Sequence, residues 1–466
     1  MKENITKDTG SRVVLLFNLT LIKIFYMVSV DLMLPQEWLM WSFNKDINWI
    51  YLPLELLVFF VVAAIYLRTQ KTNTIYSFLA TAIFLVFFIP NNSVLVLSGY
   101  DFYYYTLINL FSAVLFIAIG ILSSKEQKRI DKKPIEISDD GLEAIWQNKK
   151  LITVIRLLTL LFCGIALFQV YQYNGLDFNI LFSDMYDTRA EYADFAEGLE
   201  GSLLSYVLMI VTRTYGWFLL VCLYVSIMAK KYFDVLLCLF TYLAIFTMEM
   251  QKSTLAFLAV VFFVAILEKT KKLKKISYLS VAVILVFFVV VMIEYFVAKE
   301  SQLFTLVVRR EFYMPSYLSK IYFDFFNNNP KIWFTQDVFL IKNILKPLFG
   351  SPYTNGAVHI IARNCFSDLI ESPNNGLFSE AFSQMGVLSI VVFPIIYAIY
   401  SKVMGDAASR FGTGVALVIM AKLTLSFLNA PVLQSGRVIG VIMFALISYF
   451  VIKPFSDKKV IQNTEN

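Results

Sequence analysis

The sequence predicts an all-α membrane protein, a bundle of about twelve transmembrane helices with one large external loop. Composition is the first reason, because 58% of the 466 residues are hydrophobic and only 16% are charged, whereas soluble domains are nearer half apolar and a quarter charged. The second reason is the mean hydropathy of +0.68, which also indicates a membrane protein. The third reason is that apolar runs of about 20 residues, long enough to cross a bilayer as a helix, recur along the chain.

Taken in order, these apolar runs define the expected spans, of which the third is short. We expect the whole chain, 1–466, to form a single transmembrane domain, with residues 298–375 forming its large extracytoplasmic loop. The expected spans lie near residues 12–32, 50–67, 75–90, 103–122, 151–172, 203–228, 232–249, 253–268, 277–297, 377–400, 412–429 and 434–452.

Lysine and arginine are concentrated on alternate connections between these spans. The N-terminal segment and the connections at 123–150 and 269–275 are basic, whereas the short connections on the other side carry few cations. Cytoplasmic connections collect Lys and Arg, so both termini are predicted in the cytoplasm and the 298–375 loop outside. The first apolar run has no small-residue cleavage signal after it, which favours a retained span over a signal peptide.

The net charge of +6 would suggest a nucleic-acid partner in a soluble chain. Here the basic residues flank apolar runs, so we expect membrane lipids and no nucleic acid around the protein. Three of the four cysteines lie in apolar runs and only Cys365 lies in the loop, which excludes a disulfide framework and a cysteine-based zinc site. We expect no cofactor and no metal, since Asp31 and Glu37 are isolated acids and no phosphate-binding glycine loop is present.

The long external loop is not a flexible linker by composition. Residues Leu303–Phe326 and Ile332–Phe349 mix aromatic and basic side chains, which is typical of helices that lie at the headgroup level. Asn327 to Pro330 separates the two stretches. A structural cap on the bundle is the alternative for most of this segment.

A polar stretch, Ser372 to Gly386, connects this loop to the next span. It contains Asn374 and Asn375, predicted to bind substrate, and Glu380, about one helical turn further on. The only histidine, His359, precedes it. His359 and Glu380 are the two candidates for a general base that takes a proton from a hydroxyl group, although a single histidine is more often structural.

Cationic residues on or near the outer face form the second candidate set. Guanidinium groups bind phosphate oxygens through two hydrogen bonds and stay charged at physiological pH, so such a set can hold a lipid-linked diphosphate and stabilise it as it leaves. A charge within a span costs about 3 kcal/mol or more, so it must face a polar cavity or a partner. The same argument applies to Lys23 in the first span and Lys422 in the eleventh. The candidate diphosphate-binding residues are Arg189, Arg213, Lys252, Arg309, Arg310 and Arg363.

Two of these candidate cations have a structural alternative. Arg213 sits near the middle of the sixth span and would alternatively form a buried ion pair with Glu294 or Glu249. Arg189 would be a solvated loop charge. Arg156, near a cytoplasmic helix end, is expected to extend its charge to the interface.

Three stretches give the chain a resemblance to the Wzy-type O-antigen and capsule repeat-unit polymerases. Pro373–Gly386 followed by Val387–Ile390 looks like the polar, Asn-containing entry to a helix in that family. Gln251–Leu255 looks like its small-residue and arginine turn, and Arg309–Pro315 resembles the Arg-containing start of its large periplasmic loop. The plan of about twelve spans with one large late loop also resembles the family and covers most of the chain.

Two departures accompany the resemblance. Lys252 stands where the family usually has arginine, which keeps the charge but loses the two-pronged geometry. Ser372 and Pro373 stand where the related O-antigen ligases carry a histidine, which disfavours the ligase.

The resemblance implies a metal-independent, lipid-using membrane glycosyltransferase fold of the GT-C-like type. The protein would work in the bacterial cytoplasmic membrane and polymerise undecaprenyl-diphosphate-linked oligosaccharide repeat units into O-antigen, capsule or exopolysaccharide. A chain-length regulator and a flippase of the same pathway are its candidate partners. A lipid-linked oligosaccharide flippase is the alternative from another class, and an O-antigen ligase is a further one; the long external loop favours the polymerase over the flippase.

Overall fold

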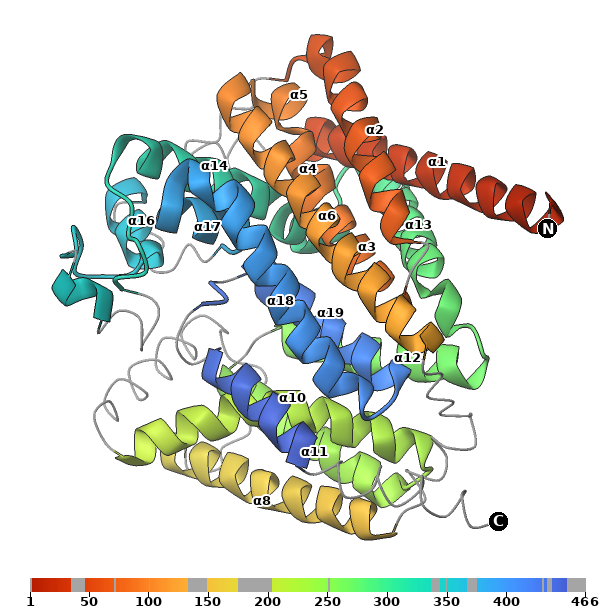
Figure 1. Ribbon diagram of the computed structural model, residues 1–466, viewed down its shortest axis with the longest axis vertical. Helices are drawn as coiled ribbons and strands as arrows, with labels where there is room; N and C mark the ends of the chain where they lie inside the picture. The colour runs from red at the N-terminus through yellow and green to blue at the C-terminus, as the bar shows by residue number, and fades with distance from the viewer. Residues whose placement is uncertain are drawn as a thin grey trace. The chain divides into compact units, whose positions relative to one another are not determined.

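The computed structural model describes residues 2–34, 47–70, 73–99, 101–132, 149–174, 203–249, 252–336, 344–348, 350–366, 375–429, 431–433 and 438–450. Every regular element within these ranges is helical (Figure 1). Within the described ranges, six helices are long and apolar enough to cross a membrane: Gly10–Met33, Trp49–Thr69, Thr74–Ser98, Phe102–Ser124, Leu273–Ala298 and Phe378–Ser409. The predicted all-helical membrane architecture is confirmed at this level.

The remaining predicted spans also coincide with helices, and among their described residues apolar stretches of 10–17 residues are found. They include Ile152–Ile165, Gly216–Met228, Tyr232–Leu243, Thr413–Asn429 and Val438–Phe450. The count of twelve membrane spans and the GT-C-like type therefore stay predictions. So do the orientation of the termini and the single transmembrane domain.

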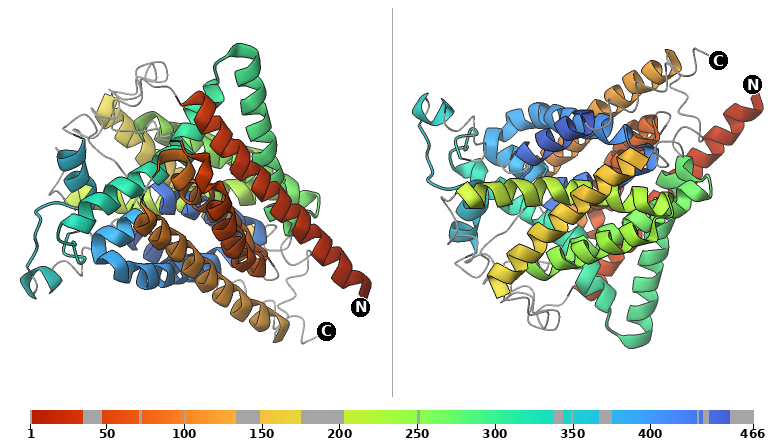
Figure 2. Two further views of the ribbon diagram at one scale, coloured as in Figure 1. Left: turned by 90° about the horizontal axis from the view of Figure 1, so that it is seen from above. Right: turned by 90° about the horizontal axis from the view of Figure 1, so that it is seen from below.

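The chain divides into two compact units. The first contains Met1–Lys133, Lys274–Lys402 and Leu423–Ser435, and the second contains Pro134–Leu273, Val403–Lys422 and Gly436–Asn466. Both views in Figure 2 show helices throughout, including the long first helix, α1 (Lys2–Met33). Helices α18 (Ser389–Ser409) and α19 (Thr413–Asn429) contribute residues to both units.

In the first unit, α1 packs on α13 (Ile276–Ala298), and α2 (Leu52–Thr69) packs on α6 (Phe102–Lys132). Aromatic side chains fill the space between α2, α6 and the third span. Phe59 stacks on Phe88 with ring centroids 5.9 Å apart, and Tyr66 lies 4.5 Å from Phe84. Such rings supply large apolar area to a core.

The third span extends beyond its predicted end at residue 90. It runs through α3 (Thr74–Ile83), a π-helical segment (Phe84–Phe88), α4 (Ile89–Asn92) and α5 (Val94–Ser98), and it is the most deeply buried of the six long spans. This span was expected to end at residue 90, before the polar residues Asn91, Asn92 and Ser93. Asn91 Nδ2 instead donates to the Phe87 carbonyl and Ser93 Oγ to the Ile89 carbonyl, so these polar groups are satisfied inside the unit.

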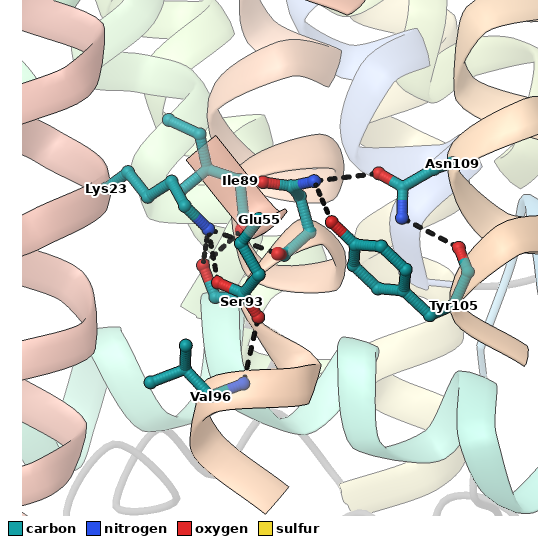
Figure 3. A network of polar contacts seen from close by, with 8 residues as sticks. Lys23, Glu55, Ile89, Ser93, Val96, Tyr105 and Asn109 are labelled. Carbon is teal, nitrogen blue, oxygen red and sulfur yellow. Dashed lines mark hydrogen bonds and ion pairs between the residues drawn. The ribbon is translucent and has the colours of Figure 1, made fainter. Parts of the chain in front are cut away.

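Lys23 of α1 is fully buried and forms an ion pair with Glu55 of α2 (Figure 3). Its Nζ lies 2.8 Å from Glu55 Oε2 and 2.8 Å from Ser93 Oγ, and it also donates to the Asn92 carbonyl at 3.1 Å. The second carboxylate oxygen of Glu55 accepts a bond from the Val96 N–H. Lys23 thus meets a partner of opposite charge within the bundle, as the cost of an intramembrane charge requires.

The first part of the 298–375 loop is docked into the first unit. It forms a second π-helical segment, Phe304–Tyr313, which we call the arginine segment, and α14 (Met314–Asn328). The arginine segment packs on α1 and on the π-helical segment Phe84–Phe88, and α14 packs on α17 (Phe378–Met385). Helices were predicted here at the membrane surface, but most α14 side chains are buried.

The second aromatic stretch predicted to be helical, Ile332–Phe349, begins differently. Residues 333–336 form a turn in which Trp333 and Phe334 have φ of 53° and 60°. Residues 337–343 and 349 lie outside the described part of the chain, and 344–348 are helical. Further on, α16 (Ala357–Cys365) packs on α14.

In the second unit, α8 (Lys149–Asn174) and α10 (Leu203–Met228) pack on α11 (Tyr232–Glu249), and α12 (Lys252–Lys269) packs on α10. Arg156 does not simply extend to the interface as expected. Its Nε and Nη2 donate to the two carboxylate oxygens of Asp234 at 2.6 and 2.9 Å. Lys422 donates to the Gly216 carbonyl at 2.6 Å and lies 4.9 Å from the Trp217 ring centroid.

Gly414 of α19 gives a test of packing in this unit. A methyl group at Gly414 would overlap the Tyr224 hydroxyl and the Glu268 carboxylate, whereas one at Gly164 of α8 would meet nothing within 4 Å. Overpacking typically costs about 1–3 kcal/mol, so we expect Gly414→Ala to lower the thermal unfolding temperature in detergent. Gly164→Ala is the matched control and should leave it unchanged or raise it. Equal behaviour of the two variants would contradict the packing around Gly414.

Candidate functional site

The polar stretch identified in the sequence folds into a buried turn and helix. Every residue from Asn375 to Gly386 is buried except Met385, which is half-buried. The Gly376 N–H donates to the Leu428 carbonyl at the end of α19, and Leu377 then adopts a φ of +45°, which is strained for a residue with a side chain. Gly386, at a φ of +57°, ends α17; a Cβ there would lie 2.8 Å from the Lys331 side chain.

Asn375 links this turn to α14. Its Nδ2 lies within hydrogen-bonding distance of the Pro315 carbonyl at 2.8 Å, Ser319 Oγ at 3.1 Å and Ser379 Oγ at 2.7 Å. The residue is 2% exposed. Asn375 therefore holds the start of α14 against the start of α17, while Asn374 lies outside the described residues. The substrate-binding roles of the two asparagines stay predictions.

Glu380 anchors the chain that follows α19. Oε2 accepts bonds from the Tyr397 hydroxyl at 2.7 Å and the Val432 N–H at 2.9 Å, and Oε1 accepts one from the Leu433 N–H at 2.8 Å. The carboxylate is buried, with the residue 2% exposed. A buried carboxylate that accepts backbone N–H bonds is stabilised in its charged form, so this geometry favours a positioning role for Glu380; its predicted role as a base is untested.

The arginine segment presents Arg309, Arg310 and Glu311 in succession, all half-buried. Burial raises the pKa of the Glu311 carboxyl, and the charge of Arg310 and a hydrogen bond from the Asn429 side chain lower it to a smaller extent. π-helical turns are rare and occur frequently at functional sites. Here one such turn carries the predicted arginine pair and packs on another, Phe84–Phe88.

These contacts bring three predicted features into one neighbourhood. The Gly376 N–H donates to the Leu428 carbonyl, and the Val432 and Leu433 N–H groups donate to Glu380. Asn375 donates to the carbonyl of Pro315, two residues after the arginine segment. We call Pro315, Asn375, Glu380, Leu428, Val432 and Leu433 the junction. The junction lies in the first unit, and it joins the arginine segment, the Asn-containing turn and Glu380, which are distant in sequence.

The other candidate residues are not joined to the junction by these contacts. His359 and Arg363 are both exposed on α16, which packs on α14. Arg213 belongs to α10 and Lys252 begins α12 in the second unit, and the side chains of both lie outside the described part of the chain, as does the whole of Arg189. Glu294, one suggested partner for Arg213, accepts bonds from Ser301 Oγ and from the N–H groups of Gln302 and Leu303.

Sequence reasoning missed Glu311 and the anchoring partners of Glu380. A signal for Glu311 was available, because it follows Arg309 and Arg310 directly in the sequence. No such signal existed for Tyr397, Val432 and Leu433, since two of these contacts use backbone groups. Across the described ranges, no group of three or more His, Cys, Asp or Glu residues is arranged to hold a metal ion.

Comparison of the chain with models of known protein families, with curated proteins and with solved structures finds no match.

Proposed function

We propose that the protein polymerises undecaprenyl-diphosphate-linked oligosaccharide repeat units on the outer face of the bacterial cytoplasmic membrane. The observation that carries the proposal is the junction: a membrane bundle that docks an arginine pair, on a π-helical turn, beside the buried Asn-containing turn. Two of the three stretches that resemble the Wzy-type polymerases contribute to this one neighbourhood. If this part of the external loop were only a structural cap on the bundle, partial burial of two arginines would cost free energy without a benefit.

In the proposed reaction a hydroxyl group of one lipid-linked repeat unit attacks the anomeric carbon of the growing glycan on another lipid carrier. A bond forms between that oxygen and the anomeric carbon as the bond from the carbon to the diphosphate breaks. The diphosphate leaves with the electron pair, and the hydroxyl proton passes to a base. Arg309 and Arg310 would bind the diphosphate and stabilise its increasing charge, as fixed cations do without a metal.

The fold that accompanies this proposal is the GT-C-like type, with both termini in the cytoplasm. Undecaprenyl-diphosphate-linked oligosaccharide is the substrate, and a chain-length regulator and a flippase are proposed partners. Glu380 and Asn375 would shape the site by fixing the turn after α19 and the start of α14. The exposed His359 and Arg363 would meet substrate only at the rim of the site.

The orientation can be tested by labelling. Because Lys and Arg gather on alternate connections, a cysteine placed at Asn355, in a cysteine-free background, should react in spheroplasts with a membrane-impermeant thiol reagent. A cysteine at Asp140 should react only after permeabilisation, and it is the matched control. Reaction of residue 140 in intact spheroplasts would reverse the orientation and exclude an outward site.

The function itself is tested by deleting the gene and measuring the length of surface glycan. A polymerase predicts surface glycan that carries a single repeat unit. Absence of all surface glycan, with lipid-linked repeats retained inside, would indicate the flippase. Long glycan that remains on its lipid carrier would indicate the ligase. Normal glycan would contradict all three.

A further inference from the structure

The arginine segment is held at both of its ends by side-chain hydrogen bonds within the first unit. Before the segment, the carboxylate of Glu294, on α13, accepts bonds from the Gln302 N–H at 3.0 Å and the Leu303 N–H at 3.2 Å. It also accepts one at 2.6 Å from the hydroxyl of Ser301, whose oxygen accepts the Phe304 N–H at 3.0 Å. The first N–H groups of a helix have no partner within it. Glu294 and Ser301 therefore supply acceptors for three of them.

The other end of the segment continues into α14 and is held there. Ser316 Oγ donates to the carbonyl of Tyr313, the last residue of the segment, at 2.8 Å. Asn375 Nδ2 lies 2.8 Å from the Pro315 carbonyl, and the hydroxyl of Tyr104, on α6, lies 3.3 Å from the Ser316 carbonyl. All five residues are buried. The exit of the segment is thus fixed to α6 and to the turn before α17.

Between these ends the segment has a rare helical register. Its buried residues are Phe304, Val308, Phe312 and Tyr313. They are four or five positions apart, which is wider than the 3.6 residues per turn of an α-helix and suits the i→i+5 bonds of a π-helix. A change to the α-helical period would rotate the arginine pair relative to this buried face. The direction of the pair therefore depends on the two fixed ends.

We propose that Glu294 and Asn375 are positioning residues, which hold the two ends of the arginine segment so that Arg309 and Arg310 face the lipid diphosphate together. This assignment rests on the proposed polymerase function. Neither positioning residue needs to touch the reacting atoms, because each acts through the backbone that it binds. For Asn375 this role differs from the predicted substrate contact, and the two roles have different consequences once the arginines are removed.

Hydrogen exchange of the full-length protein in lipid nanodiscs measures the positioning directly. In Glu294→Ala and in Asn375→Ala, we expect the backbone amides of residues 304–313 to exchange roughly fivefold faster, the typical effect of losing a helix cap. The amides of α2 should keep their native rates. Glu300→Ala and Asn328→Ala, at exposed residues before the segment and at the end of α14, are the matched controls and should change nothing. Unchanged exchange of 304–313 in both test variants, or equal acceleration throughout the first unit, would overturn the assignment.

Turnover with lipid-linked repeat units separates positioning from a merely structural role. We expect each test variant to lower turnover roughly tenfold or more, as misplaced binding groups do, and Glu294→Gln, which keeps one oxygen acceptor, to lose less. When Arg309 and Arg310 are already replaced by alanine, adding either test variant should change the remaining turnover by less than about twofold, because both act through the arginines.

An undiminished further loss in that arginine-free background would overturn the positioning role, and for Asn375 it would indicate substrate contact instead. Failure of the proposed function is a different result, in which the native protein itself elongates no repeat unit. The exchange measurement needs no turnover, so it still decides whether Glu294 and Asn375 hold the segment.

Discussion

Glu55→Gln is expected to destabilise the first unit by about 3–5 kcal/mol, the usual cost of breaking a buried ion pair by removing one partner. Lys23 and Glu55 are both fully buried and 2.8 Å apart. The glutamine would leave the Lys23 ammonium in the bundle without a negative charge, so that it must either stay charged and unpaired or lose its proton. The loss is measured as a shift of the unfolding midpoint in mixed detergent micelles.

Two further variants isolate the ion pair as the cause. Asp324→Asn is the matched control, because Asp324 pairs with Lys320 while half exposed, its side chain being 53% accessible; exposed pairs contribute about 1 kcal/mol or less. The double variant Lys23→Met with Glu55→Leu removes both charges and should recover most of the lost stability. If the double variant is as unstable as Glu55→Gln, burial of an unpaired charge is not the reason for the loss.

The fold was predictable from the sequence to the extent that a bilayer limits the choices. In lipid, a segment of about 20 apolar residues must satisfy its backbone groups internally, so hydropathy alone predicts helices. Helices occupy each of the predicted spans. The partner of Lys23 could not be predicted, because Glu55 stands in the first turn of its helix and looks like a residue of the interface. Which polar residue faces which partner depends on helix packing, and the hydropathy pattern contains no such information.

Asn375 and Glu380 could be named as candidates from the sequence, but their contacts could not. Asn375 and Glu380 were identified because they lie in the polar stretch that enters a span, and the arginine pair because guanidinium groups bind phosphate oxygens. The period of a helix indicates that Glu380 lies one turn after the asparagines, but not whether it faces a substrate or the chain. Its hydrogen-bond partners lie at residues 397, 432 and 433, and through them it anchors the chain that follows α19. Pairs this distant in sequence are formed only by the tertiary fold.

Arg309→Ala and Arg310→Ala are each expected to lower polymerisation roughly a hundredfold, corresponding to about 3 kcal/mol of transition-state stabilisation. Fixed cations that bind the leaving diphosphate contribute more as its charge increases than they do in the bound substrate. Turnover should therefore fall more than affinity for the lipid-linked donor. Glycan length on cells and turnover in nanodiscs measure the effect, with the amount of protein in the membrane determined in parallel.

Lysine replacements separate charge from geometry at the same two positions. A lysine keeps the positive charge but cannot make two parallel hydrogen bonds to a phosphate, so Arg309→Lys and Arg310→Lys should recover activity only in part if the guanidinium geometry matters. Arg68→Ala, at an exposed arginine in the last turn of α2, is the matched control and should make glycan of normal length. Normal glycan from both alanine variants, at normal membrane levels, would exclude the arginine pair as a diphosphate clamp. The cationic residues of the second unit, Arg213 and Lys252, would then be the next to replace.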